Sequence, residues 1–176
     1  MLQEKYKKEV IPLMKEKFGY KNNSAVPKIE KVIVNVGVGS FSRDEQGQES
    51  VAKDLALITG QKPVPTLAKK AISAFKVRKE MVVGLKVTLR GKRMYDFVSR
   101  LINIALPRTR DFRGLSVKSV DNSGNLTIGV KEHIVFPELG SEDIRRIFGL
   151  EVTIVSNARS REEAMELFKL LGFPIK

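Results

Sequence analysis

The residues with the greatest capacity for chemistry in this chain are cations, and most of them lie in one segment. Residues 61–113 carry 14 Lys and Arg side chains but only three acids, so this third of the chain supplies +11 of the total charge of +12. Cations placed so closely in a chain neutralise phosphate groups well. The pattern therefore predicts a surface that binds a polyanion. A merely solvated face is the competing interpretation, but so much charge without a counter-charge would repel itself.

The cations are densest in the stretch AKKAISAFKVRKE, Ala68–Glu80, which has neither a helical nor a strand period. We therefore expect a long exposed basic loop there. Phe75 has two interpretations: the ring folds back onto the core and anchors the loop, which we favour, or it stacks on a base or ribose at the tip.

Catalytic and metal-binding patterns are weak. The chain has no cysteine and a single histidine, His133, which excludes a zinc site built from such ligands within one chain. No nucleophile is placed beside His133 by a known spacing, so we expect a structural role for it. The S-x-x-K match at Ser73–Lys76 carries no weight without its companion motifs. We expect no enzyme activity, no catalytic residue, no metal and no cofactor.

The glycines of VGVGS do not form a nucleotide-binding loop. Position 42 is serine where G-x-G-x-x-G requires its third glycine. These glycines are interpreted as a strand end or bulge that permits close backbone approach.

Two strands are predicted to position the polar residues. In Ile29–Val38, alternate valines form one apolar face, which leaves Asn35 on the other. In Met81–Arg90, alternate apolar residues form one face and Gly84, Lys86, Thr88 and Arg90 the other. This second face is small, polar and cationic, as a phosphate-lined groove requires. The segment PVPTL is expected to be an edge strand, because prolines are tolerated there.

Helices are predicted from apolar residues at helical spacing. They are expected at 2–18, kinked by Pro12 and ended by Gly19; through Val51 and Ile58 to Gly60; and from Met94 to Ala105, stopped before Pro107. A last helix opens with the capping box of Ser160 and Glu163. Shorter elements are also expected: a hairpin or meander of SVKSV with NLTIGV, a helix Glu142–Phe148 and a strand Val152–Val155.

This order of elements predicts an α+β fold, a two-layer sandwich of a mainly antiparallel sheet with helices packed on one face and a long basic loop. Residues 1–176 are expected to form a single RNA-binding domain. The start of the chain lacks a secretory apolar region and no apolar run is long enough to span a bilayer, so we expect a cytoplasmic protein without membrane contact.

RNA is a better candidate than DNA. The sequence has no helix-turn-helix, basic-zipper or finger pattern, and its cations lie on a strand face and in loops. Asn35, Lys86, Thr88 and Arg90 suit a shallow RNA minor groove, where amides and hydroxyls meet 2′-hydroxyls. The face lacks the aromatic pair that binds unpaired strands, so structured RNA is favoured.

Over its whole length the chain resembles the family of bacterial large-subunit ribosomal protein five. The resemblance rests on VPKIEKVIVNVGVG, LALITGQKP, AKKAISAFKVRKEM, GLKVTLRGKRMYDFV, LPRTRDFRG, GNLTIGVKEHIVFPEL and LGFPIK. It implies binding of 5S rRNA through the exposed sheet face, with Asn35, Gln61 and Thr88 at the family's contact positions. Lys62, Lys86 and Arg90 are added from the cation pattern and the strand alternation.

The resemblance also implies partners and a second contact. The family joins 5S rRNA to 23S rRNA in the central protuberance, beside other 5S-binding proteins, and reaches small-subunit ribosomal protein thirteen. Its loop approaches the peptidyl-site tRNA. The matching residues here are Lys69, Lys70, Ser73, Phe75, Lys76, Arg78 and Lys79.

The chain departs from the family at three positions. Glu80 stands where glycine is usual, and as an acid it slightly reduces the positive charge of the loop. Val120 and His133 replace residues more usually Phe and Gln, for which we expect only local repacking. The bridge to the small subunit has no distinctive motif, and the helix Glu142–Phe148 is only a candidate for it.

Two rival functions remain open at this point. An RNA-directed enzyme with the same basic face would need a pocket with convergent carboxylates or a cofactor. A general cationic chaperone or a membrane-surface binder would show no preference among polyanions.

Overall fold

The computed structural model describes residues 2–39, 44–75, 77–110, 112–139 and 147–176. Five strands form one antiparallel sheet in the order β2-β3-β1-β5-β4. The strands are β1 (Ile29–Gly37), β2 (Val64–Leu67), β3 (Val82–Leu89), β4 (Leu126–Val130) and β5 (Leu150–Ser156). The predicted α+β architecture is confirmed, and the PVPTL strand lies at an edge as expected.

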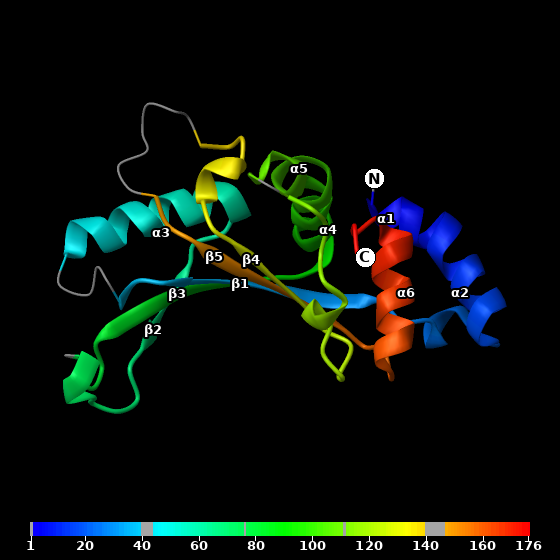
Figure 1. Cartoon of the computed structure of the whole chain (residues 1–176), viewed down its shortest axis with the longest axis horizontal. Helices are drawn as coiled ribbons and strands as arrows, with labels where there is room; N and C mark the ends of the chain where they lie inside the picture. Colours follow the sequence, from blue (N-terminus) through cyan, green and yellow to red (C-terminus); the bar gives the residue numbers. More distant parts are fainter. Residues whose placement is uncertain (1, 40–43, 76, 111, 140–146) are drawn as a thin grey trace.

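The helices cover one face of the sheet (Figure 1). They are α1 (Leu2–Lys5), α2 (Ile11–Phe18), α3 (Glu45–Thr59), α4 (Gly91–Arg100), α5 (Leu106–Arg108) and α6 (Arg161–Leu171). Helices α3, α4 and α5 lie over the sheet, whereas α6 packs with α1 and α2 at one end of it. The other face of the sheet is consequently open.

Strand alternation decides which side chains enter the core. Val32, Val34 and Val36 of β1 are fully buried, and Leu85, Val87 and Leu89 of β3 are at most 5% exposed. Since successive side chains point to opposite faces, their neighbours lie on the open face. The predicted apolar faces of both strands are confirmed.

Two helices contain a π-helical turn just before a proline. In the N-terminal helix, η1 (Tyr6–Val10) precedes Pro12, and in the central helix η5 (Leu101–Ala105) precedes Pro107. Proline lacks an N–H and its ring crowds the carbonyl four residues before it, and a wider turn relieves both problems. The expectation that the central helix stops before Pro107 is therefore wrong, because the helix continues to Arg108.

The helix ends follow the sequence more closely. Gly19, Gly60 and Gly172 all end helices in the left-handed conformation. The Ser160 hydroxyl caps α6 by accepting a hydrogen bond from the Glu163 N–H (3.2 Å). The Glu163 carboxylate accepts from the Arg159 N–H (2.9 Å), one residue earlier than a standard capping box places it.

The predicted hairpin of SVKSV and NLTIGV is only half correct. NLTIGV contributes β4, but Val117–Ser119 form a 3₁₀ turn (η6), and Val120 makes a single bridge to Leu126. The Ser116 hydroxyl accepts a hydrogen bond from the Lys118 N–H (3.2 Å) and so favours a turn over a strand. Most of the helix proposed for Glu142–Phe148 lies outside the described residues.

His133 is structural, as expected, and fully buried. Its ring stacks on Phe148 at a centroid distance of 3.9 Å, and its Nδ1 accepts a hydrogen bond from the Phe148 N–H (3.3 Å). Its Nε2 lies 3.7 Å from the Asp54 carboxylate on α3. Burial lowers the pKa of His133, and the Asp54 carboxylate opposes that shift. The ring therefore joins α3 to the start of β5 in its neutral form.

The lowered pKa of His133 makes stability depend on pH. Below the unfolded pKa of about 6.5 the unfolded chain binds the proton more readily than the folded chain, so stability falls as pH falls. We expect His133→Gln, which keeps an acceptor for the Phe148 N–H, to remove about 1 kcal/mol of the loss between pH 7.5 and 5.5. Urea unfolding of both proteins at both pH values measures this. Equal losses in the two proteins would contradict it.

Candidate nucleic-acid interface

The open face of the sheet is organised in rows by the strand register. One row runs across four strands through Val64, Lys86, Asn35 and Glu151. The next row holds Thr88, Ile33, Thr153 and Thr127. Directly opposite side chains on one face of a sheet are about 5 Å apart. The face thus combines short polar groups with the cation Lys86, the acid Glu151 and the apolar side chains of Val64 and Ile33.

Four of the predicted RNA contacts meet on this surface. Asn35 and Lys86 are register partners, both exposed, and Thr88 lies two residues further along β3. Gln61, which follows the end of α3, donates a hydrogen bond from Nε2 to the Thr88 carbonyl (3.3 Å). That bond joins two positions 27 residues apart in the sequence. The structure therefore brings Asn35, Gln61, Lys86 and Thr88 together at the β3 side of the face.

Lys62 and Arg90 extend this cationic side. Lys62 is exposed and adjoins Gln61, and exposed Arg90 occupies the extended N-cap position of α4 directly after β3. The three cations of this side therefore come from β3 (Lys86), from the connection between α3 and β2 (Lys62) and from the connection between β3 and α4 (Arg90). The opposite half of the face carries Glu151 on β5 and no cation within the described stretches of β4 and β5.

The segment predicted as a basic loop joins β2 to β3. Its base is closed by hydrogen bonds from the Ala68 N–H to the Met81 carbonyl and from the Glu80 N–H to the Ala68 carbonyl (both 2.9 Å). Further out, Ile72 and Val77 exchange two backbone hydrogen bonds (2.9 and 3.1 Å) around the 3₁₀ turn η4 (Ser73–Phe75). The segment between β2 and β3 projects beyond the sheet on the side away from α3 (Figure 1).

Most of the residues predicted to contact tRNA are exposed on this segment. They are Lys69, Lys70, Ser73, Phe75, Arg78 and Lys79, while Lys76 lies outside the described residues. The Phe75 side chain is 76% exposed, so the favoured expectation that it anchors onto the core is wrong. The pairing of Ile72 with Val77 closes the hairpin instead, and the ring is left on its surface.

Glu80 adopts a conformation that ordinarily requires glycine. It has a φ of 68° and is the one non-glycine residue with positive φ among those described. This is the position where the resemblance led us to expect glycine. The left-handed conformation costs an L-residue about 1–2 kcal/mol, because Cβ approaches the following carbonyl oxygen.

Replacing Glu80 with glycine is expected to stabilise the protein by about 1 kcal/mol by removing that strain. Glu80→Ala is the matched control, since it removes the same charge but retains Cβ at the same φ. Thermal unfolding of the three proteins measures the effect. An equal gain in both variants would show that charge, and not backbone strain, is responsible.

The outer half of the open face was not predicted from the sequence. Thr127, Thr153 and Glu151 share that face, and the Thr127 and Thr153 hydroxyls lie 3.4 Å apart. The alternation of LEVTIVS was visible in the sequence. However, only the pairing of β5 with β1 shows that its polar residues continue the row of Asn35.

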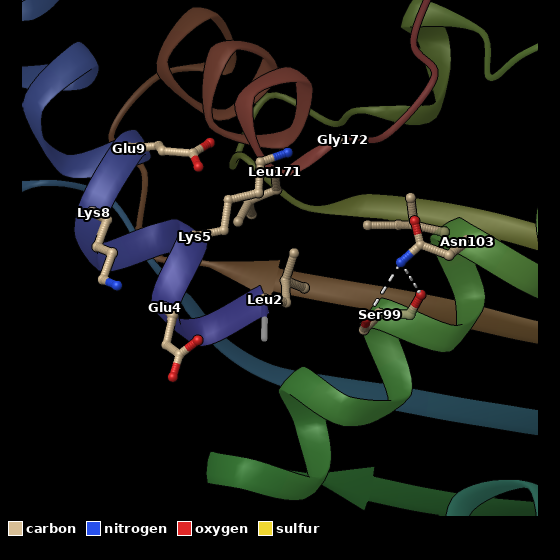
Figure 2. Close-up of a pocket in the computed structure, with 10 residues that line it drawn as sticks. Leu2, Glu4, Lys5, Lys8, Glu9, Ser99, Asn103, Leu171 and Gly172 are labelled. Carbon is tan, nitrogen blue, oxygen red and sulfur yellow. Dashed lines mark hydrogen bonds between the residues drawn. The ribbon is translucent and has the colours of Figure 1, made fainter.

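A hollow of about 470 Å³ lies on the helical side between α1, α4 and the end of α6. Figure 2 shows that its carboxylates, Glu4 and Glu9, point in different directions, with Lys5 between them. Asn103 donates to the carbonyl (2.9 Å) and hydroxyl (3.3 Å) oxygens of Ser99. The hollow therefore lacks the convergent carboxylates that an enzyme of the rival class would need.

Two features of the described part of the chain concern metals and membranes. Its His, Asp and Glu residues form no group of three or more that could hold a metal ion. Among the same residues, no helix has the length and apolar character needed to cross a membrane.

Comparison with known proteins gives a consistent result. Residues 22–78 match the family described as Ribosomal protein L5, and residues 82–175 match the model of the C-terminus of the same ribosomal family. The large ribosomal subunit protein uL5 of Dictyoglomus turgidum is 55% identical over 100% of this chain and 98% of the relative. That of Halothermothrix orenii is 52% identical over 99% of this chain and 97% of the relative. The chain therefore belongs to the L5 family of ribosomal proteins, which are structural proteins of the large subunit and not enzymes.

Proposed function

We propose that this chain binds 5S rRNA through the open face of its sheet and helps to attach that RNA in the central protuberance of the large subunit. One observation carries the proposal: four predicted contact residues lie together on the open face. The register of β1 with β3 places Asn35 beside Lys86 and Thr88, and a hydrogen bond to the Thr88 carbonyl holds Gln61 next to them. An amide, an ammonium and a hydroxyl on a flat surface suit the ribose and phosphate groups of an RNA minor groove.

The composition of the face favours structured RNA over unpaired strands. The described open-face residues of β1, β3, β4 and β5 include no aromatic side chain on which successive bases would stack. Lys62, Lys86 and Arg90 provide phosphate contacts along one side of the face. Specificity then depends on Asn35, Gln61 and Thr88, because contacts to phosphate carry no sequence information.

The hairpin between β2 and β3 supplies the second contact in the proposal, with the peptidyl-site tRNA. Its cations Lys69, Lys70, Arg78 and Lys79 are exposed, and Phe75 presents an aromatic ring at the outer turn. Basic groups around an exposed ring suit a nucleic acid whose bases are accessible. By its place in the sequence, Lys76 belongs to the same set.

The remaining partners in the proposal follow from family membership. They are 23S rRNA, the other 5S-binding proteins of the large subunit and small-subunit ribosomal protein thirteen. The chain works in the ribosome, which in bacteria is cytoplasmic.

Equilibrium binding to 5S rRNA and to a length-matched duplex RNA, across a salt series, tests the proposal. We expect the native chain to bind 5S rRNA at least about a hundredfold more tightly and to keep that margin as salt rises. Thr88→Ala is expected to reduce 5S affinity by about tenfold and to leave duplex affinity unchanged, because a lost hydroxyl removes a specific contact and no charge.

The salt dependence separates this account from general polyanion binding. If both RNAs bind alike with steep, parallel salt slopes, phosphate attraction explains all of the affinity. Unchanged selectivity in Thr88→Ala would remove Thr88 from the site even if the native chain prefers 5S rRNA.

A further inference from the structure

A shallow hollow of about 510 Å³ lies on the open face, beyond the cationic side of the interface. Its lining comes from β1, β4, β5 and the residues that flank them: Asn35, Gly37, Gly129, Val130, Lys131, Gly149, Leu150 and Glu151. The register places Asn35 opposite Glu151, and Glu151 opposite Gly129. The hollow is thus continuous with the row of residues that contains Lys86 and Asn35.

A carboxylate is unexpected on a surface that binds phosphates. Glu151 is exposed, and within the described part of the chain neither its carboxylate nor the Asn35 amide has a hydrogen-bond or ion-pair partner. An ionised carboxylate only accepts hydrogen bonds, whereas an amide both donates and accepts. An ionised Glu151 would repel a phosphate but would suit hydrogen-bond donors on an RNA base.

Gly37 and Gly129 keep the hollow open, although nothing inside the fold requires glycine at either position. Neither has positive φ, and a Cβ placed on either would meet nothing within 4 Å. The fold would therefore accept a Cβ at both positions, but a side chain there would occupy the space of the hollow. Glycine in a strand commonly marks a site of close approach by a ligand or another backbone.

We propose that this hollow receives an unpaired guanine of the bound RNA, with its Watson–Crick edge directed at Glu151 and Asn35. Guanine presents two adjacent donors, N1–H and the N2 amino group, beside the acceptor O6. The two carboxylate oxygens of Glu151 match the donors, and the Asn35 amide N–H matches O6. Adenine, cytosine and uracil do not offer two adjacent donors on that edge. The glycines let the base lie against the backbone.

This inference deepens the proposed RNA-binding function and rests on it. The variant Glu151→Gln gives opposite expectations under the two accounts. If the face attracts RNA by charge alone, loss of an acid tightens binding. If Glu151 accepts two hydrogen bonds from guanine, the amide NH₂ group of glutamine would face one of the two guanine donors and lose that hydrogen bond. The affinity for 5S rRNA would then fall about tenfold.

The experiment measures 5S rRNA binding by the native chain, Glu151→Gln and Glu30→Gln. Glu30 is an exposed acid at the start of β1 and is absent from the hollow, so its variant controls for the change in charge. Each complex is also treated with a reagent that modifies N1 and N2 of unpaired guanines. We expect the native chain to protect one such guanine and Glu151→Gln to expose it while the rest of the footprint remains.

Gly129→Val provides an independent test, because it puts a side chain into the hollow at a position where a Cβ meets nothing within 4 Å. We expect an unchanged or higher Tm, about tenfold weaker 5S binding and exposure of the same guanine. The inference would be overturned if the native chain protected no unpaired guanine. It would also be overturned if Glu151→Gln and Gly129→Val matched the native chain in 5S affinity and in footprint. Failure of the proposed function is distinct, because the native chain would then not prefer 5S rRNA over duplex RNA.

Discussion

Replacing Gly84 with valine is expected to destabilise the protein by about 2 kcal/mol and to lower its Tm by about 4–8 °C. A Cβ at Gly84 would lie 2.7 Å from the Thr66 hydroxyl and 3.2 Å from the Val36 carbonyl oxygen. The hydroxyl can rotate away, but the carbonyl belongs to β1 and moves only with the sheet. The register of β2 and β3 would shift to relieve the contact, and the open face would be distorted with it.

The register partner of Gly84 supplies the matched control. Gly37 lies opposite it in the β1–β3 pair, yet a Cβ there would meet nothing within 4 Å. Gly37→Val should therefore leave Tm unchanged or slightly higher, because valine favours strands. Thermal unfolding of both variants checks the pair. If Gly84→Val and Gly37→Val lowered Tm equally, the cause would be the loss of a strand glycine and not the close contact at Gly84.

Removing Lys86 and Arg90 together is expected to weaken 5S rRNA binding by about 10- to 100-fold at low salt and to lower the salt slope by about two units. Both side chains are exposed, so replacement with alanine removes phosphate contacts without disturbing the core. The affinity for duplex RNA should fall in parallel, since phosphate contacts do not distinguish sequences. Binding titrations at several salt concentrations measure both quantities.

Lys7 and Lys8 provide the control for this double variant. They are exposed on η1, on the helical side of the molecule, and their replacement changes the net charge by the same amount. We expect Lys7→Ala with Lys8→Ala to change 5S affinity by less than about threefold. If both double variants weaken binding equally, total charge governs the interaction and the open face is not its site.

The strand faces and helix ends were predictable because local rules govern them. Alternation placed Val32, Val34 and Val36 in the core, and glycines that adopt left-handed conformations ended the helices at the expected positions. The predictions failed where a local rule met a competing one. Pro107 was expected to end its helix, but a π-helical turn before it allowed the helix to continue.

The side-chain position of Phe75 and the neighbours of Lys86 could not be predicted in the same way. Exposure of Phe75 depends on whether the hairpin bends back over the body of the protein, which the local pattern does not specify. Asn35 and Glu151 were both visible in the sequence. Their placement side by side in one row depended on the register of β1 with β5.

By itself the sequence determined the concentration of charge in residues 61–113, the identity of the polar strand face and the family resemblance that comparison confirmed. These depend on composition and on periodicity within one segment, which are local properties. Only the tertiary structure decided that cations gather on the β3 side and that a carboxylate and open glycines gather on the β5 side. Strand order and register bring distant segments together, and they follow from the packing of the whole chain.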